Sequence, residues 1–215
     1  MRRAFIATVA SAAGLVAIVG AQAKAPQGGI DVCGASGCTH VAAGSDTEQL
    51  YIGTSQVPWH AATPAPFYVL HLRWSSNSSE DQVVYWVPAA DRVRWGGGTA
   101  AWTHPDASAE TILQQASFGL TAFAVQLTRV TVGGRAVSAP QTYARLFRHA
   151  RWMPAKELDP SWLRIRLTTS VPSPWSDEAA TILIQRKAPF LYVDGAVMKI
   201  PPDVARRARL GLPLR

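Results

Sequence analysis

The stretch from Phe67 to Pro88 constrains the fold most, because it has the pattern of two β-strands joined by a polar loop. In its first half Tyr68, Leu70 and Leu72 fall on one face, and Val69, His71 and Arg73 fall on the other. A period of two is typical of an antiparallel strand that buries one face. The sequence therefore predicts a β-hairpin whose apolar face packs on a core.

Further hairpins and three short helices are predicted along the chain. Strands are expected at 30–33, 38–42, 48–52, 92–95, 124–132 and 162–169, and on both sides of Asp194-Gly195, a dipeptide that suits a type I′ turn. Helices are expected behind an Asp106 or Ser108 cap, behind a capping box from Ser138 to Gln141, and at 201–211. This order is not a βαβ alternation. It predicts an α+β fold, mainly antiparallel β-sheet built from hairpins with three short helices.

The first 23 residues have the pattern of an export signal. Arg2 and Arg3 precede a charge-free apolar run that ends in the small-residue sequence A-Q-A. An uncleaved membrane anchor is the alternative, since about 20 apolar residues can span a bilayer. The ordinary and the twin-arginine export routes both remain open. No second apolar run is long enough to cross a membrane, so we expect a secreted or cell-envelope protein.

Three parts of the chain are distinguished on this basis. Residues 1–23 form the signal peptide, 24–124 a β-rich first half with a disulfide-closed turn and the central hairpin, and 125–215 an α+β second half. The two halves can also pack as one domain, because about 190 residues suffice for one sizeable core.

The two cysteines lie close together in the sequence C-G-A-S-G-C, from Cys33 to Cys38. Outside the cytoplasm such a pair is expected to form a disulfide, and its two glycines give the backbone the freedom that a tight turn needs. We interpret it as a local structural disulfide.

The net charge indicates which classes of binding partner are favoured. Two of the 21 Lys and Arg residues lie in the signal, which leaves 19 against 14 Asp and Glu, a net charge of +5. A basic exported protein meets anionic wall polymers, head groups and acidic polysaccharides. The alternative is that the charge serves solubility alone. Nucleic acid is not expected as a partner, because of the compartment and because no nucleic-acid-binding motif occurs.

Aromatic and basic residues supply the candidate binding sites. Exposed tryptophans stack on sugar faces, and three of the eight lie in segments predicted as loops: Trp59, Trp102 and Trp175. The alternative is that these three anchor packed loops. Candidates for contact with anions lie on the second and third predicted helices: Arg145, Arg148, Arg206 and Arg207. For them the alternative is a solvated helix face.

No catalytic motif of a serine hydrolase, zinc enzyme or phosphate-binding loop occurs, and no metal or cofactor is expected. Dispersed residues that a fold could bring together are His71, Glu80, Asp91, Asp177 and Asp194.

Several features together resemble exported proteins of high-GC actinobacteria for which no activity is known. They are the N-terminal signal, the C-G-x-x-G-C turn, the V-G-G-R turn before the predicted helix with Tyr143, Leu146 and Phe147, and the P-S-P-W-S-D loop before the last Asp-Gly hairpin. The resemblance implies a location outside the cytoplasm and carries over no catalytic residue.

Two functional hypotheses follow. The first is a non-enzymatic cell-envelope or extracellular protein that binds an anionic or sugar polymer, or a protein, through a basic and tryptophan-bearing surface. The second is an extracellular hydrolase with dispersed catalytic residues.

Overall fold

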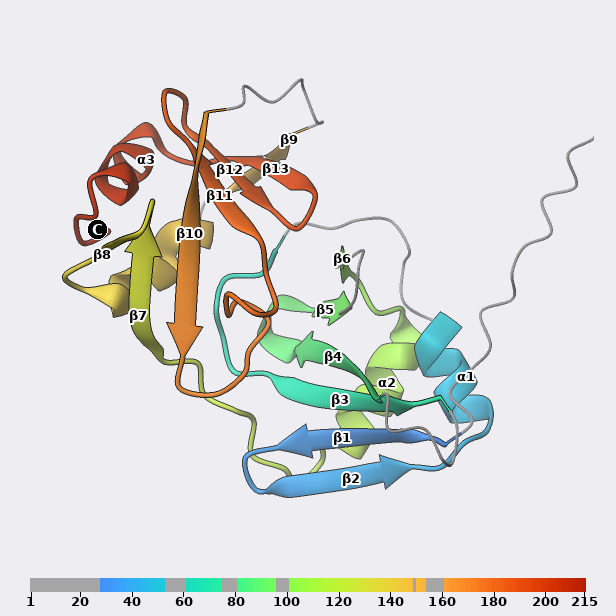
Figure 1. Cartoon of the computed structure of the whole chain (residues 1–215). Helices are drawn as coiled ribbons and strands as arrows, with labels where there is room; N and C mark the ends of the chain where they lie inside the picture. The colour runs from blue at the N-terminus through green and yellow to red at the C-terminus, as the bar shows by residue number, and fades with distance from the viewer. Residues whose placement is uncertain (1–27, 53–60, 75–80, 96–100, 149, 154–160) are drawn as a thin grey trace, which may run out of the picture.

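The computed structural model describes residues 28–52, 61–74, 81–95, 101–148, 150–153 and 161–215, which form two antiparallel β-sheets and a few short helices (Figure 1). The first sheet has the spatial order β2 (Gly37–Val41), β1 (Ile30–Gly34), β3 (Tyr68–Arg73), β4 (Asp81–Val87), β5 (Arg92–Trp95) and β6 (Ala101–Thr103). The second has the order β8 (Arg135–Ala136), β7 (Leu127–Val132), β10 (Trp162–Thr169), β11 (Ile182–Gln185), β12 (Phe190–Val193), β13 (Ala196–Lys199) and β9 (Arg151–Met153).

The central hairpin is confirmed. Strands β3 and β4 pair from Tyr68 opposite Trp86 to Arg73 opposite Asp81. Leu70 and Leu72 of this face are buried, as the alternation predicts, in a core that includes α2 (Ala107–Ala116), and the half-buried Tyr68 packs against it. Helix α2 begins as predicted at Asp106, whose side chain accepts a hydrogen bond from the backbone N–H of Ala109.

The disulfide between Cys33 and Cys38 is also confirmed, and it joins directly opposite residues of β1 and β2. The turn that it closes packs on the segment between the two sheets, because Ala35 N–H donates to the carbonyl oxygen of Thr121 at 2.6 Å. Gly34 is required at this approach, since a Cβ there would clash with that same oxygen. A local covalent link thus also fixes a long-range contact.

Two predicted elements differ from the structure. Residues 48–52 belong to a helix, α1 (Ser45–Ile52), and not to a strand. The hydroxyl of Thr47, in the first turn of this helix, accepts from the N–H of Gly44 and donates to its carbonyl oxygen, and the helix buries Leu50. A segment of five residues with mixed polarity is too short to distinguish the strand period of two from the helical period of 3.6. The packing of α1 beside α2 therefore decides that the segment is helical (Figure 1).

The predicted capping box at Ser138 and Gln141 is wrong. The helix there is the 3₁₀ helix η2 (Pro140–Phe147), and its N-cap is Ala139, without a side-chain hydrogen bond. The hydroxyl of Thr142 donates to the carbonyl oxygen of Ala139 and accepts from the N–H of Leu214, so it ties η2 to the C-terminal segment and does not cap the helix. The burial prediction is nevertheless correct: Tyr143, Leu146 and Phe147 are all buried.

The second sheet follows the sequence patterns closely. Strand β10 has the predicted bounds, and Gly133 and Gly134 form the turn between β7 and β8 with φ of +56° and +83°. Asp194 and Gly195, at φ of +47° and +93°, form the turn between β12 and β13. The predicted terminal helix is α3 (Pro202–Arg209). The remaining short element is the 3₁₀ turn η1 (Pro88–Ala90).

The two sheets share the larger of two cores. Phe67 of the first half forms a bridge with Phe123, and buried side chains from both sheets pack together around Trp175. The fold is thus a β-rich α+β fold with mainly antiparallel sheets, as predicted. Among the described residues, no helix is long and apolar enough to cross a membrane.

Candidate functional site

The predicted tryptophan surface is not found where the structure can show it. Trp59 lies outside the described residues. Trp102 and Trp175 are buried, with exposed fractions of 2% and 0%, and their rings pack 5.8 Å apart between the two sheets. Trp175 Nε1 also donates to the carbonyl oxygen of Ala62 at 2.8 Å. The expectation that these two side chains are exposed is therefore wrong. The alternative, that they are packed in the interior and anchor their segments, is correct for both.

The predicted arginines lie on two neighbouring helices. Arg145 and Arg148 are exposed at the end of η2, and Arg206 is exposed on α3. Arg207 is half-buried, and its Nε donates to the carbonyl oxygen of Pro213 at 2.6 Å. It therefore holds the C-terminal segment against α3. Contact of the four side chains with an anion remains a prediction.

The dispersed hydrolase candidates occupy separate places. His71 lies on β3 opposite Asp31, and Glu80 lies outside the described residues. The three aspartates take part in three different ion pairs: Asp91 with His104 at 2.5 Å, Asp177 with Arg164 and Arg166, and Asp194 with Arg94. The contacts among the described residues do not assemble a pair of carboxylates.

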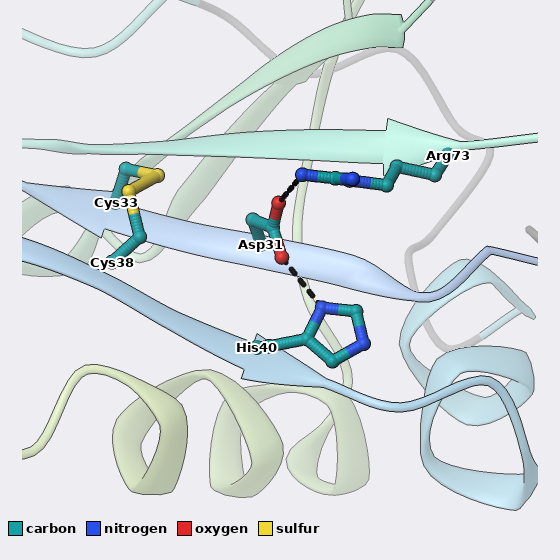
Figure 2. Close-up of a disulfide and its surroundings, with 5 residues drawn as sticks. All are labelled: Asp31, Cys33, Cys38, His40 and Arg73. Carbon is teal, nitrogen blue, oxygen red and sulfur yellow. Dashed lines mark hydrogen bonds and ion pairs between the residues drawn. A yellow bond between two sulfur atoms is a disulfide. The ribbon is translucent and has the colours of Figure 1, made fainter. Parts of the chain in front are cut away.

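A cluster that the sequence did not reveal surrounds Asp31, beside the disulfide (Figure 2). The carboxylate of Asp31 on β1 accepts hydrogen bonds from His40 Nδ1 of β2, at 2.6 Å, and from Arg73 of β3. Burial raises the pKa of Asp31, but these two hydrogen bonds outweigh burial and hold the pKa below its usual value. Because the cluster joins three adjacent strands at one end of the sheet, we assign it a structural role.

A second unpredicted pair joins the two sheets. Arg94 of β5 donates from Nε to the carboxylate of Asp194 in the β12–β13 turn at 3.1 Å, and both side chains are buried. Asp194 also accepts from the N–H of Thr181 at 2.8 Å. The indole N–H of Trp102 lies near this carboxylate without making a hydrogen bond of good geometry. Burial raises the pKa of Asp194 against the lowering effect of Arg94.

A groove lined largely by basic and hydroxylic residues, called the basic groove below, lies on the described surface. It has a volume of about 460 Å³ and lies on the face of the second sheet that points away from the core. Its lining residues come from β7, the β7–β8 turn, β10 and the loop that follows: Arg129, Thr131, Gly133, Gly134, Arg164, Arg166, Thr168 and Asp177. Arg164 is beside the glycine turn, since Gly133 N–H donates to its carbonyl oxygen at 2.9 Å.

The strand register spaces the three arginines of the groove evenly. Arg164 and Arg166 are two residues apart on one face of β10, which separates their Cα atoms by about 6.5 Å. Arg166 is opposite Thr131, and Thr168 is opposite Arg129, so that Arg129 and Arg166 are diagonal neighbours about 7–8 Å apart. Arg166 is therefore the middle of a row of three positive charges.

The row of arginines makes the groove electropositive. Three guanidinium groups and one carboxylate give the groove a net charge of +2. Two like charges 7 Å apart repel by roughly 0.6 kcal/mol in water and by about 2 kcal/mol at an effective dielectric constant of about 20. Asp177 relieves part of this repulsion from 3.6 Å (Oδ1 to Arg164 Nε) and 3.5 Å (Oδ2 to Arg166 Nη1). A bound anion would relieve more.

The sequence pattern predicts only part of this groove. The alternation in 162–169 places Arg164 and Arg166 on the polar face of a strand, and that was the available signal. The pairing of β7 with β10, which adds Arg129, and the return of the following loop, which adds Asp177, are long-range features.

Among the described residues, no group of three or more His, Cys, Asp or Glu side chains is placed to hold a metal ion. No protein-family model matches the chain, and neither curated proteins nor solved structures give a significant match. The function is therefore inferred from the chemistry of the groove itself.

Proposed function

We propose that this is an exported, non-enzymatic protein that binds an anionic polymer at the cell envelope or outside the cell, and that the basic groove is its binding surface. The observation that carries the proposal is the row formed by Arg129, Arg166 and Arg164 on one open sheet face with a net charge of +2. The export signal pattern in residues 1–23 and the Cys33–Cys38 disulfide support the location.

An anionic polymer is favoured over a neutral glycan. Recognition of a neutral sugar depends on exposed aromatic rings, and two of the three tryptophans predicted to supply them are buried. The described residues that line the groove are charged, hydroxylic or glycine. They offer hydrogen-bond donors and positive charge, which suit repeated anionic groups.

Co-sedimentation of the purified protein with purified cell walls, in a salt series, tests the proposal. The double variant R164Q/R166Q should bind roughly 30-fold more weakly, at about 1 kcal/mol for each basic side chain near an anionic surface. Both side chains are about half exposed, so the fold should be unaffected. R145Q/R148Q is the comparison, because it removes the same charge from η2, the other surface for which contact with an anion is predicted.

The outcomes separate the alternatives. Binding that disappears at high salt and with R164Q/R166Q, but persists in R145Q/R148Q, supports the groove. Equal losses in both double variants would mean that the groove contributes no more to binding than the arginines of η2, which contradicts its assignment as the binding surface. Binding that survives high salt would indicate glycan recognition by aromatic residues, and the absence of binding at any salt would refute the proposal.

A further inference from the structure

The groove already contains one anion, the carboxylate of Asp177. Asp177 reaches Arg164 and Arg166 from the loop after β10, and its backbone N–H donates to the carbonyl oxygen of Leu167 at 2.8 Å. The same loop is anchored by the buried Trp175. The backbone at Asp177 is therefore fixed, and only rotation of the side chain can move the carboxylate away from the arginines.

The ion-pair contacts of Asp177 with Arg164 and Arg166 are long. The two N–O distances, 3.5 and 3.6 Å, exceed those of charge-assisted hydrogen bonds. Oδ1 of Asp177 is buried and has no hydrogen-bond partner. Asp177 thus lowers the charge of the groove while the guanidinium groups of Arg164 and Arg166 keep hydrogen-bond capacity for another acceptor.

The other donors of the groove suit an acceptor with several diverging oxygens. In the β7–β10 ladder each of two arginines is opposite a threonine, Arg166 opposite Thr131 and Arg129 opposite Thr168. Each pair presents a planar guanidinium and a hydroxyl to the same space. A tetrahedral phosphoryl group can accept from both at once, with a bidentate arginine contact and a further oxygen for the hydroxyl.

From these contacts we propose that the groove takes the phosphoryl groups of a phosphate-bearing polymer, and that Asp177 is a built-in competitor which the ligand displaces from Arg164 and Arg166. This inference rests on the proposed function, since it names the anion and the regulation of the same groove. The competitor restricts binding to ligands with closely spaced charges, because a single anion gains less than it loses by displacing Asp177.

The test is a calorimetric titration of the purified protein with inorganic polyphosphate, and with poly-glutamate of matched charge as the carboxylate probe. Asp177→Asn should bind polyphosphate at least five-fold more tightly than the wild type. Glu178→Gln is the matched control: the neighbouring residue is exposed and its replacement makes the same change in net charge. We expect less than a two-fold change for it, and weaker binding of poly-glutamate by the wild type.

Each contrary result overturns a specific part of this proposal. Weaker binding by Asp177→Asn would show that Asp177 positions the arginines, and equal effects of the two variants would reduce the role of Asp177 to net charge. Equal affinity for poly-glutamate would overturn the phosphoryl preference. If walls bind while polyphosphate does not, this inference fails alone. If polyphosphate binds and Asp177→Asn tightens it while walls do not bind, the proposed function fails and the groove chemistry stands.

Discussion

Replacing Arg94 by methionine should destabilise the protein by about 3–5 kcal/mol, because it leaves a buried carboxylate without its cation. The side chains of Arg94 and Asp194 are 1% and 3% exposed, and the backbone N–H of Thr181 is the other hydrogen-bond donor to Asp194. Methionine keeps the volume of the aliphatic stem, so the loss measures charge and hydrogen bonding more than a cavity. Since domains are stable by about 5–15 kcal/mol in total, the effect is large.

The partner substitution completes a double-mutant cycle. Asp194 lies at φ +47°, where asparagine is tolerated, so Asp194→Asn removes the charge without backbone strain. It leaves Arg94 buried and unpaired and should also destabilise by several kcal/mol. The double variant R94M/D194N should be more stable than the sum of the single effects predicts, with a coupling energy of about 2–3 kcal/mol. Urea unfolding followed by tryptophan fluorescence measures all four proteins.

The pH dependence gives a second measure of the same pair. Burial already raises the pKa of Asp194, and removal of Arg94 takes away the main lowering influence. In R94M the carboxyl group therefore binds a proton more readily in the folded state than in the unfolded state. The contribution of Asp194 to the stability of R94M should be greatest at low pH and should fall as the pH rises through the folded pKa of this group. The destabilisation should thus be smaller at about pH 5 than at about pH 8. A single-variant loss below about 1 kcal/mol, or zero coupling, would refute the reasoning.

Three further predictions concern the first sheet. Replacing Cys33 and Cys38 by serine should lower the free energy of unfolding by about 2 kcal/mol, as expected for so short a loop; a loss above about 4 kcal/mol in urea unfolding would contradict a local role. The pKa of Asp31 is lowered in the folded protein. The contribution of this carboxylate to stability is therefore present above the unfolded pKa of about 4 and is lost as the pH falls through the folded pKa. Asp31→Asn should therefore flatten the acid limb of a plot of melting temperature against pH, and an unchanged limb would count against the cluster. Gly34→Ala should destabilise by about 1–3 kcal/mol through its clash with a backbone carbonyl, whereas Gly44→Ala, with no neighbour within 4 Å, should cost less; equal melting temperatures of the two variants would disprove this.

Local patterns in the sequence predicted the elements that local physics determines. The alternation in 162–169 fixed β10, and Gly133-Gly134 and Asp194-Gly195 predicted two turns because their positive φ angles require such residues. The disulfide followed from spacing and from the expected compartment. None of these inferences needed knowledge of which elements meet in space.

The burial of Trp102 and Trp175 could not be predicted in this way. Each side chain is in a segment without a strong period, and each is covered by the other sheet of the molecule. The ion pair between Arg94 and Asp194 has the same origin, since its partners are 100 residues apart. Contacts between the sheets depend on how two separately patterned faces meet, and no local pattern contains that information.

The buried Trp175 is connected with the basic groove through the loop that carries it. The sequence suggested that this ring contacts a ligand directly, yet its complete burial fixes the loop between β10 and β11. Two residues later that loop presents Asp177 to Arg164 and Arg166, where its carboxylate sets the charge of the groove. The inward face of β10, with Ile165 and Leu167 buried, forces the two arginines outward by the period of two. Under the proposed function, Trp175 therefore acts through packing and not by contact with the ligand, because it fixes the loop that holds the Asp177 carboxylate against Arg164 and Arg166.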